Sequence, residues 1–486
     1  MAGAPVIAGR QPPPSGMPPE QNLAPRDVAA LADELVAYHA RFAPLFRRRE
    51  QRHWALQYLR GQLLDLERKS IEPMALALEG GNVQAMQQFL SDGAWDDDRI
   101  LQAHQHLVAE TLGDPETGVL IIDSTEFPKQ GTHSVGVARQ YCGALGKVAN
   151  CQSAVVAGYA SRKGYTLVDR RLYLPECWFT PAYAPRRQKC GVPSDLGFRT
   201  KAELAGELIA TLKHRGALPF QWVTFDEHFG RNPTLLDQIA GLGVWYLAEV
   251  PHDTRVWLER PPTAVPPHAG KGRRPSRERV LAGDAAPVSV KRLAEQLPAD
   301  AWTRAQVHEG AKGPLVAEFA FLRAVAIRND LPGPAVWVVL RRSLGEQPEL
   351  KVYLSNAPRD LPKAAFVRLS GMRWPIEAAI RECKDELGMD HYEVRGWRGW
   401  HHHLTMTFLA HHFLVRARRR LGEKIGSPHG GPGPATPARG LAQTPARCHH
   451  RPGSHLPHPT PELCRLLRAS TAHAVPTRYL LAKVTL

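Results

Sequence analysis

The chain has 486 residues, 43% of them hydrophobic, which is enough for more than one packed core. Lys and Arg number 62 against 47 Asp and Glu, and the resulting net charge of +15 favours a polyanionic partner. The seven cysteines form no C-x-x-C pair, and no apolar run approaches the ~18 residues of a membrane span. These features exclude a disulfide framework, a cysteine-based zinc module and a membrane-spanning protein, so we expect a cytoplasmic protein.

The first 112 residues divide into a leader and a helical region. Residues 1–26 lack the long apolar core of a signal peptide and are expected to form a flexible leader. Over residues 27–112 apolar positions recur at helical spacing, as in "LADELVAYHARFAPLF", which predicts a helical N-terminal domain. Basic residues such as Arg47, Arg48 and Arg52 lie between those positions. Two interpretations remain open: a DNA-reading helix pair or a solvated charged face.

Residues 113–250 carry alternating strands and helices, and two of the strands are followed by an aspartate. The run "VLIIDSTEFPKQG" predicts a buried strand over Val119–Ile122 that delivers Asp123 to its end. A shorter strand, Phe220–Phe225, is followed by Asp226. The carboxyl ends of strands in an open α/β sheet are where ligands bind. A strand-end aspartate is therefore either a catalytic or metal-binding carboxylate, or simply a polar cap.

The remaining residues fall into three segments. Residues 251–362 contain the strand patterns "VAEFAFLRAVAIR", "AVWVVLRRS" and "LKVYLSNAP", which predict a β-rich insertion. Helical patterns return over residues 363–421. Residues 422–486 are rich in Pro, Arg and His and are expected to be a disordered tail. From Arg416 to the end there are 12 Lys and Arg against 2 Asp and Glu, so most of the net charge falls there.

The order of these elements predicts the fold class. Three strands, a helix, a strand, a helix, a strand, an insertion and a final helix indicate an α/β, RNase H-like mixed sheet with an all-β insertion before the last catalytic helix. The helical N-terminal domain and the disordered tail complete the chain. Two Mg²⁺ ions bridged by carboxylates, with Mn²⁺ as a substitute, can activate a water or a 3′-hydroxyl for attack on a phosphodiester.

The returning helix, "RWPIEAAIRECKDELGMD", carries the candidates for a third acid of the site. Glu377, Glu382 and Glu386 all lie there, but Glu377 and Glu382 point roughly 140° apart at 3.6 residues per turn. Arg373 and Lys384 fall within about 40° of Glu377 on the helical wheel. Spacing therefore favours Glu377, flanked by two cations suited to phosphate oxygens.

The motif R-x-x-x-E-x-x-x-x-x-x-K at Arg373, Glu377 and Lys384 resembles the C-terminal signature of DDE transposases of bacterial insertion sequences. The fuller signature begins with a tyrosine where this chain has Ser370. The blocks "IIDSTEFPKQGTHSVGVARQYCGALGKVANCQ", "VTFDEHFGRNP" and "DHYEVRGWRGWHHH" resemble the blocks around the first acid, around the second acid and after the third. The similarity covers roughly residues 54–414.

This resemblance implies a metal-binding catalytic triad of Asp123, Asp226 and Glu377. It also implies Mg²⁺-dependent DNA strand cleavage at the element ends, followed by strand transfer into target DNA. The implied partners are double-stranded DNA, comprising the terminal inverted repeats and the target, and a second copy of the chain in a synaptic homodimer. Two alternatives remain: a nuclease of the same fold without strand transfer, and an inactive, transposase-derived DNA-binding protein.

Several further residues have two interpretations each. Lys129, Arg139 and Lys147 follow the first acid and could hold DNA phosphates or simply be solvated. Trp337 could stack on an extruded base, although an ordinary buried strand tryptophan is the preferred interpretation. The histidines at 401–403 point in different directions on a helix, which favours a structural or DNA-contacting role over metal binding.

Overall fold

The computed structural model describes residues 25–268, 270, 273–281, 286–310 and 313–424. Nearly all of the expected leader, and the tail beyond residue 424, lie outside the described residues. The helices are α1 Pro25–Ala40, α2 Arg49–Leu63, α3 Ile71–Ala77, α4 Val83–Ser91, α5 Asp97–Leu112, α6 Ala184–Lys189, α7 Lys201–Arg215, α8 Glu227–Gly230, α9 Pro233–Gly241, α10 Val290–Gln296, α11 Lys363–Ser370, α12 Trp374–Leu387 and α13 Trp397–Lys424. The strands are β1 Val119–Pro128, β2 Ala138–Cys142, β3 Lys147–Ser161, β4 Gly164–Tyr173, β5 Trp222–Phe225, β6 Trp245–Glu249, β7 Arg255–Trp257, β8 Thr263–Ala264, β9 Arg279–Val280, β10 Val288–Ser289, β11 Thr303–Gly310, β12 Gly313–Arg328, β13 Leu331–Ser343 and β14 Leu350–Ser355.

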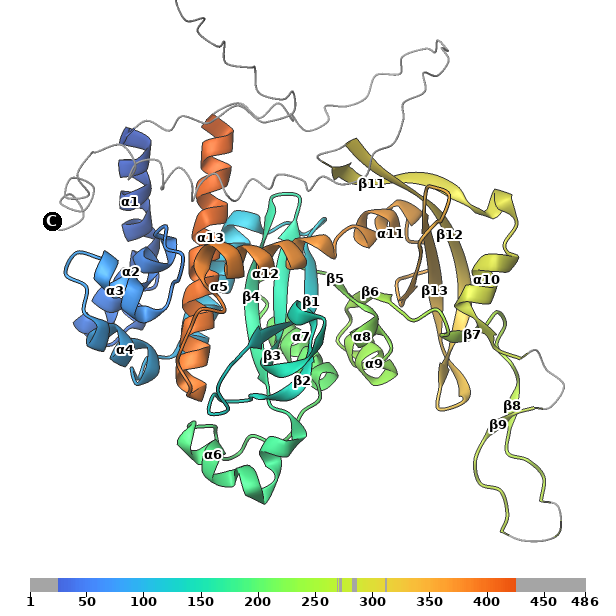
Figure 1. Ribbon diagram of the computed structural model, residues 1–486. Helices are drawn as coiled ribbons and strands as arrows, with labels where there is room; N and C mark the ends of the chain where they lie inside the picture. Colours follow the sequence, from blue (N-terminus) through green and yellow to red (C-terminus); the bar gives the residue numbers. More distant parts are fainter. Residues whose placement is uncertain (1–24, 269, 271–272, 282–285, 311–312, 425–486) are drawn as a thin grey trace, which may run out of the picture.

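A mixed sheet lies at the centre of the molecule (Figure 1). Its central strands follow the order β4–β3–β1–β5–β6. Strand β3 is antiparallel to both β1 and β4, whereas β5 is parallel to β1 and to β6. The protein is therefore a mixed α/β protein, and this strand order is consistent with the RNase H-like sheet that the sequence predicts.

The first strand is longer than its apolar run. β1 continues to Pro128 and pairs with β3 along its whole length, with Asp123 opposite Val156. The expectation that the strand ends at Ile122 is therefore wrong, because β3 satisfies the backbone of the polar half of β1 as well as that of the apolar half. Strand β2, which pairs with the start of β3, was also not predicted.

The β-rich segment after residue 250 extends the central sheet. Strand β14 pairs antiparallel with β6, and β13, β12, β7 and β10 follow outward, so the strands form one sheet of 12 strands. The segment is not all-β, because it contains α10. Ser289 begins that helix by accepting a hydrogen bond from the backbone N–H of Arg292 at 3.3 Å.

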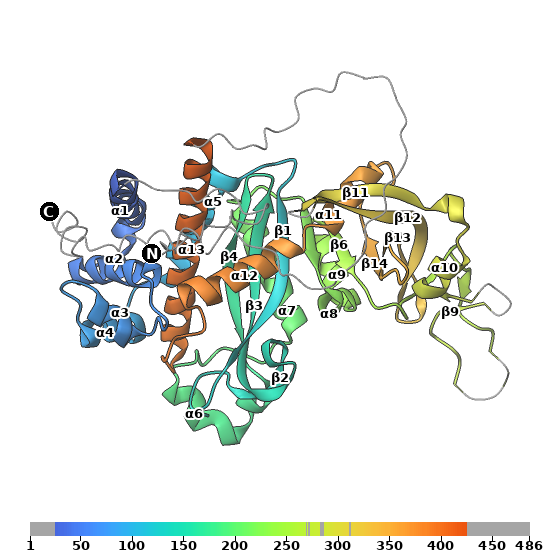
Figure 2. The ribbon, with the colours of Figure 1, turned by 45° about the horizontal axis from the view of Figure 1, so that its top comes forward.

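Helices cover both faces of the central sheet. Side chains alternate between the faces of a strand, so Val119 and Ile121 pack in the core on the side of α12 and α13. Leu120 and Ile122 pack in the opposite core, with α7 and α9. Helix α12 lies across β4, β3 and β1 (Figure 2). The odd-numbered residues of β1, including Asp123, therefore face α12.

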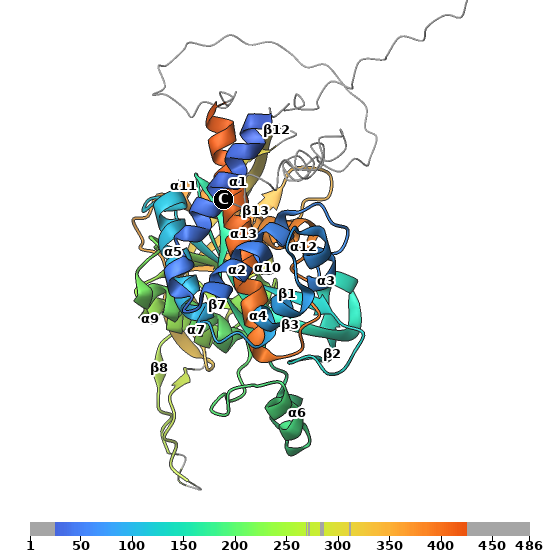
Figure 3. The ribbon, with the colours of Figure 1, turned by 90° about the vertical axis from the view of Figure 1, so that its left-hand side faces the viewer.

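The N-terminal helices pack around the long helix α13, and α1 runs beside it (Figure 3). The Tyr38 hydroxyl donates to the backbone oxygen of Leu409 at 3.0 Å. On α5, His104 Nε2 lies 2.9 Å from the backbone oxygen of Leu167 in β4. One continuous core joins α1–α5 to α12, α13 and the sheet. Among the described residues, no helix is long and apolar enough to cross a membrane.

Candidate active site

The two aspartates singled out in the sequence lie side by side on neighbouring parallel strands. Strands β1 and β5 are in register at Ile121 and Thr224. Two residues further along each strand, Asp123 and Asp226 occupy the same level and face the same side of the sheet. Strand β5 ends at Phe225, so the two strands separate where the carboxylates begin. The register of the sheet thus brings together two acids about a hundred residues apart in the chain.

A further acid, which the sequence interpretation missed, continues this line. Strands β5 and β6 are in register at Phe225 and Ala248, so Glu249 lies at the level of Asp226. Leu247 packs in the core beside α12, and Glu249, two residues later, faces the same side. We call Asp123, Asp226 and Glu249 the acid row. Glu249 could have been noticed because it, too, stands at the carboxyl end of an apolar parallel strand.

Helix α12 brings Glu377 over this row because it approaches the sheet closely. The contact is made at Gly158 of β3, where an added Cβ would lie 3.3 Å from Cγ1 of Ile376. Ile376 itself is 1% exposed and directly precedes Glu377. The absence of a side chain at Gly158 therefore sets the height of the helix above the acids.

Replacing Gly158 with Val should push α12 away from the sheet. The methyl groups need the space that Ile376 occupies, and such overpacking typically costs about 1–3 kcal/mol. We expect a lower free energy of unfolding by chemical denaturation and weaker activity from a displaced Glu377. Adding Ile376→Ala should recover much of the stability, whereas Gly131→Ala, where no atom lies within 4 Å, should change nothing. Full stability in the Gly158→Val variant would show that the close approach does not position α12.

The electrostatics of Asp123 show that these acids influence one another. Burial, together with the negative charge of Asp226, raises the pKa of the Asp123 carboxyl to about 7. Glu377 also raises this pKa, whereas Arg373 lowers it. The backbone N–H of Ser124 donates to Asp123 Oδ1 at 2.7 Å and opposes the shift. The acids are therefore crowded in a partly buried place, where a cation would relieve their repulsion.

Asp226 has a second, structural contact. Its Oδ1 accepts hydrogen bonds from the backbone N–H groups of His228 at 3.1 Å and Phe229 at 3.3 Å, which caps the short helix α8. Asp226 is thus a helix N-cap, a role that the sequence interpretation did not predict. The capping contacts do not prevent metal binding by Asp226, because both hydrogen bonds use the same carboxylate oxygen, Oδ1.

Arg373 lies among the acids rather than on an outer face of the helix. Its NH2 lies 2.5 Å from Oε1 of Glu377, and its Nε lies 3.8 Å from Oε2 of Glu249. Burial lowers the pKa of the Arg373 guanidinium, but the surrounding carboxylates outweigh this effect and raise it above its usual value. The residue predicted to contact DNA phosphates is paired with the acids in this structure.

The other glutamates of α12 have different surroundings. Glu382 is 6% exposed, and its carboxylate accepts from the Tyr165 hydroxyl at 2.8 Å and from Arg418 at 3.0 Å. Burial alone would raise the pKa of Glu382, but hydrogen bonds from His411 and Arg418 hold it well below its usual range. The structure therefore places Glu377, and not Glu382, beside Asp123.

Two of the basic residues predicted to contact DNA hold the framework together. Lys384 Nζ donates to the backbone oxygen of Glu126 at 2.9 Å and joins α12 to β1. Lys129 Nζ donates to the backbone oxygen of Tyr392 at 3.1 Å, and burial lowers its pKa to about 8. Arg139 and Lys147 are exposed on β2 and β3. Of these four residues, Arg139 and Lys147 are thus the two that present their charge to solvent.

Trp337 belongs to the core. It is 7% exposed, its Nε1 donates to the backbone oxygen of Pro358 at 3.0 Å, and its ring packs 5.5 Å from that of Phe366. Its ring is therefore not presented to a DNA base in this conformation. This agrees with the preferred interpretation, in which Trp337 is an ordinary buried strand residue.

The three consecutive histidines of α13 make contacts within the fold. His402 stacks on Trp95 with ring centroids 3.6 Å apart. Nδ1 of His403 lies 2.8 Å from the Tyr58 hydroxyl, and Nδ1 of His401 lies 2.8 Å from the backbone oxygen of Trp397. Burial lowers the pKa of His403 to about 3. These contacts support the structural interpretation of residues 401–403.

Basic residues of the N-terminal helices divide into two groups. Arg52 donates to the backbone oxygen of Phe46 at 3.0 Å, and Arg68 pairs with Glu393 at 2.7 Å. By contrast, Arg47 and Arg48 are exposed and line a hollow of about 630 Å³ between α2 and α4. Both interpretations of this region, a DNA-binding surface and a solvated face, thus remain hypotheses.

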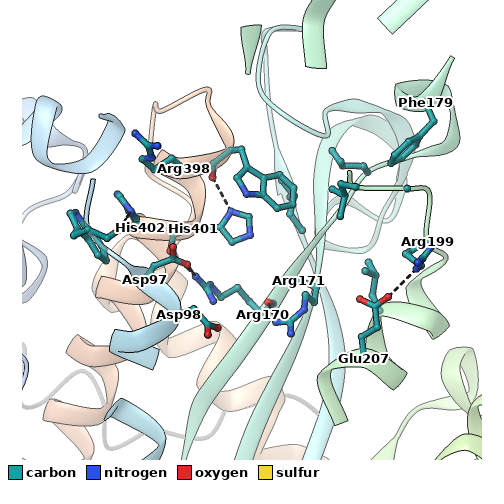
Figure 4. A pocket seen from close by; sticks show the side chains of 17 residues that line it. Asp97, Asp98, Arg170, Arg171, Phe179, Arg199, Glu207, Arg398, His401 and His402 are labelled. Atoms are coloured by element: carbon teal, nitrogen blue, oxygen red, sulfur yellow. Dashed lines mark hydrogen bonds and ion pairs between the residues drawn. The ribbon is translucent and has the colours of Figure 1, made fainter. Parts of the chain in front are cut away.

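A separate pocket of about 380 Å³ lies between α5, β4 and the start of α13 (Figure 4). Its charged side chains are largely paired with one another: Arg170 with Asp97, and Arg199 Nε with Glu207 Oε1 at 3.0 Å. The side chain of Arg170 is only 3% exposed. This pocket is therefore explained by ion pairs that tie α5 and α7 to their surroundings.

The residues of the candidate site fit a hard divalent cation. Asp123, Asp226 and Glu377 offer only carboxylate oxygens, which Mg²⁺ prefers. Among the described residues, however, no three His, Cys, Asp or Glu side chains already converge as a metal-binding group. Glu377 lies against Arg373 instead. The carboxylate oxygens suit Mg²⁺, but metal binding by Glu377 would require this residue to leave Arg373 and turn to the ion.

Carboxylates gathered in this way can hold the divalent metal ions that act on phosphodiesters. Residues 41–314, more than half of the chain, match the DDE superfamily endonucleases. The chain therefore belongs to this family, which confirms the resemblance that its motifs indicate. The matched residues include Asp123 and Asp226 but end before α12, so the position of Glu377 rests on the geometry described above.

A relative supports the same family. The chain is 31% identical over 181 residues to a probable transposase for insertion sequence element IS701 from Microchaete diplosiphon. The matched segment covers 37% of this chain and 43% of the relative. The similarity thus spans less than half of either protein.

Proposed function

We propose that the protein is a transposase that cleaves DNA at the ends of an insertion sequence and transfers the freed strands into target DNA. The observation that carries this proposal is the register of β1 and β5, which brings Asp123 and Asp226 level on one face of the sheet. Glu377, on α12, lies near enough to raise the pKa of Asp123. Membership of the DDE superfamily endonucleases and the similarity to a probable insertion-sequence transposase support it.

The carboxylates of Asp123, Asp226 and Glu377 would hold Mg²⁺, as two ions, with Mn²⁺ as a substitute. When bound, the metal supplies activation of the attacking oxygen and charge stabilisation at the leaving oxygen. Asp226 is held in place by its cap contacts, and Asp123 by Ser124. Arg373, released from Glu377, offers the NH2 end of its guanidinium to a phosphate oxygen, while its Nε stays directed towards Glu249.

The reaction has two steps of phosphodiester chemistry. In the first, a water oxygen attacks phosphorus and the P–O3′ bond breaks, which leaves a 3′-hydroxyl on the element end and a 5′-phosphate on the other strand end. In the second, that 3′-hydroxyl attacks a phosphodiester of target DNA and forms the new joint as the target 3′-oxygen leaves. Exposed cations such as Arg139 and Lys147 would contact the DNA backbone. We propose that a homodimer brings the two ends together in the bacterial cytoplasm.

The test is to incubate the protein with DNA carrying the flanking ends of its encoding element, supercoiled target DNA and Mg²⁺. Products are then resolved on a denaturing gel. We expect nicks at the element ends and, later, strands joined to the target. Cleavage that never yields joined products would favour the alternative, a nuclease without strand transfer. End binding with no cleavage in Mg²⁺ or Mn²⁺ would favour a transposase-derived DNA-binding protein.

A further inference from the structure

The carboxylate of Glu249 is shared between two cations. Lys351 Nζ, on β14, lies 3.2 Å from Oε1 of Glu249, and Nε of Arg373 lies 3.8 Å from Oε2. The side chain of Glu249 is 17% exposed, so these pairs are less screened than surface pairs are. Lys351 thus fixes one oxygen of Glu249 and leaves the other directed towards Arg373.

Arg373 lies between two carboxylates that belong to different parts of the site. Its NH2 contacts Glu377 on its own helix, and its Nε faces Glu249 at the end of β6. A metal ion held by Asp123 and Asp226 would compete with Arg373 for Glu377. If Glu377 turned to the metal, the guanidinium, 31% exposed, would need another partner, because a partly buried unpaired charge is costly.

We propose that Glu249 is a positioning residue that receives Arg373 when Glu377 binds the metal ion, while Lys351 holds the Glu249 carboxylate in place. The inference rests on the proposed function, since it takes Glu377 as a metal ligand. It also gives the strands after residue 250 a part in the site. Lys351 reaches the acid row from β14, which pairs directly with β6.

The experiment measures Mn²⁺ affinity in the full-length protein without DNA, by the relaxation of water protons. Glu249→Gln should weaken binding about tenfold, the lower end of the range typical when a residue supporting a metal ligand is lost, because Arg373 then stays on Glu377. Arg373→Gln removes the competitor and should strengthen binding. In the Arg373→Gln background, Glu249→Gln should have no further effect.

A control and two contrary outcomes complete the test. Glu349, whose Oε1 is 4.0 Å from Lys351 and whose side chain is 74% exposed, serves as the matched control, and Glu349→Gln should leave the affinity unchanged. Equal losses from Glu249→Gln with and without Arg373 would overturn the inference, as would no loss at all. If Asp226→Asn also leaves Mn²⁺ affinity unchanged, the proposed function fails. If Asp226→Asn weakens binding while Glu249→Gln does not, only the inference about Glu249 fails.

Discussion

Asp123→Asn, Asp226→Asn and Glu377→Gln should each reduce the rate of DNA strand cleavage by about a thousandfold or more. A bound metal contributes several kcal/mol of charge stabilisation in the transition state, and every 1.4 kcal/mol corresponds to a factor of ten in rate. Binding of the element ends should persist, because these acids repel DNA rather than attract it. The measurements are single-turnover cleavage on a denaturing gel and end binding by gel shift.

These substitutions should leave the fold intact, which makes the loss of activity interpretable. Asn is as good an N-cap as Asp, so Asp226→Asn keeps the start of α8 while removing a charge that raises the pKa of Asp123. The melting temperature of the Asp226→Asn variant should therefore stay level or rise. Asp385→Asn, an exposed acid on the helix that carries Glu377, is the matched control and should cleave normally. Cleavage that survives Glu377→Gln would show that the third acid lies elsewhere.

The sequence predicted the parts of this site that depend on local patterns. Apolar runs located the strands before Asp123 and Asp226, and helical spacing favoured Glu377 over Glu382. The structure shows a physical reason for that preference. The carboxylate of Glu382 is buried and already accepts hydrogen bonds from Tyr165 and Arg418. That these acids bind metal stays a prediction.

The features that the sequence did not predict depend on contacts between distant segments. The extent of β1 to Pro128 follows from its pairing with β3. Lys384 falls on the same side of the helical wheel as Glu377, but spacing could not show that the backbone oxygen of Glu126 lies within its reach. The same holds for Glu249, because its place beside Arg373 depends on the register of β6 with β5.

Buried histidines should make the protein unusually sensitive to mild acid. Burial lowers the pKa of His104 to about 4 and that of His403 to about 3, and it lowers that of His412 well below its usual value. In the unfolded chain these groups titrate near 6.5. Between pH 6.5 and about 4 the unfolded state therefore binds more protons than the folded state, so stability falls as the pH falls.

The expected loss is steep and begins before carboxylates with ordinary pKa values titrate. Asp123, whose pKa is raised to about 7, gains stability as the pH falls and offsets about one proton of this loss. Each such histidine contributes up to about 1.4 kcal/mol per pH unit in this window. The melting temperature, followed by differential scanning fluorimetry, should be level from pH 8 to 7 and drop progressively below pH 6.5.

His104 Nε2 contacts the backbone oxygen of Leu167, and Gln can donate the same hydrogen bond. His104→Gln should therefore flatten the pH dependence by about one proton, whereas His106→Gln, exposed on the same helix, should not. A melting temperature that stays level from pH 8 to pH 5 would contradict the neutral, buried state of these side chains, because protonation would then carry no cost to the packing of α5 and α13 against the sheet.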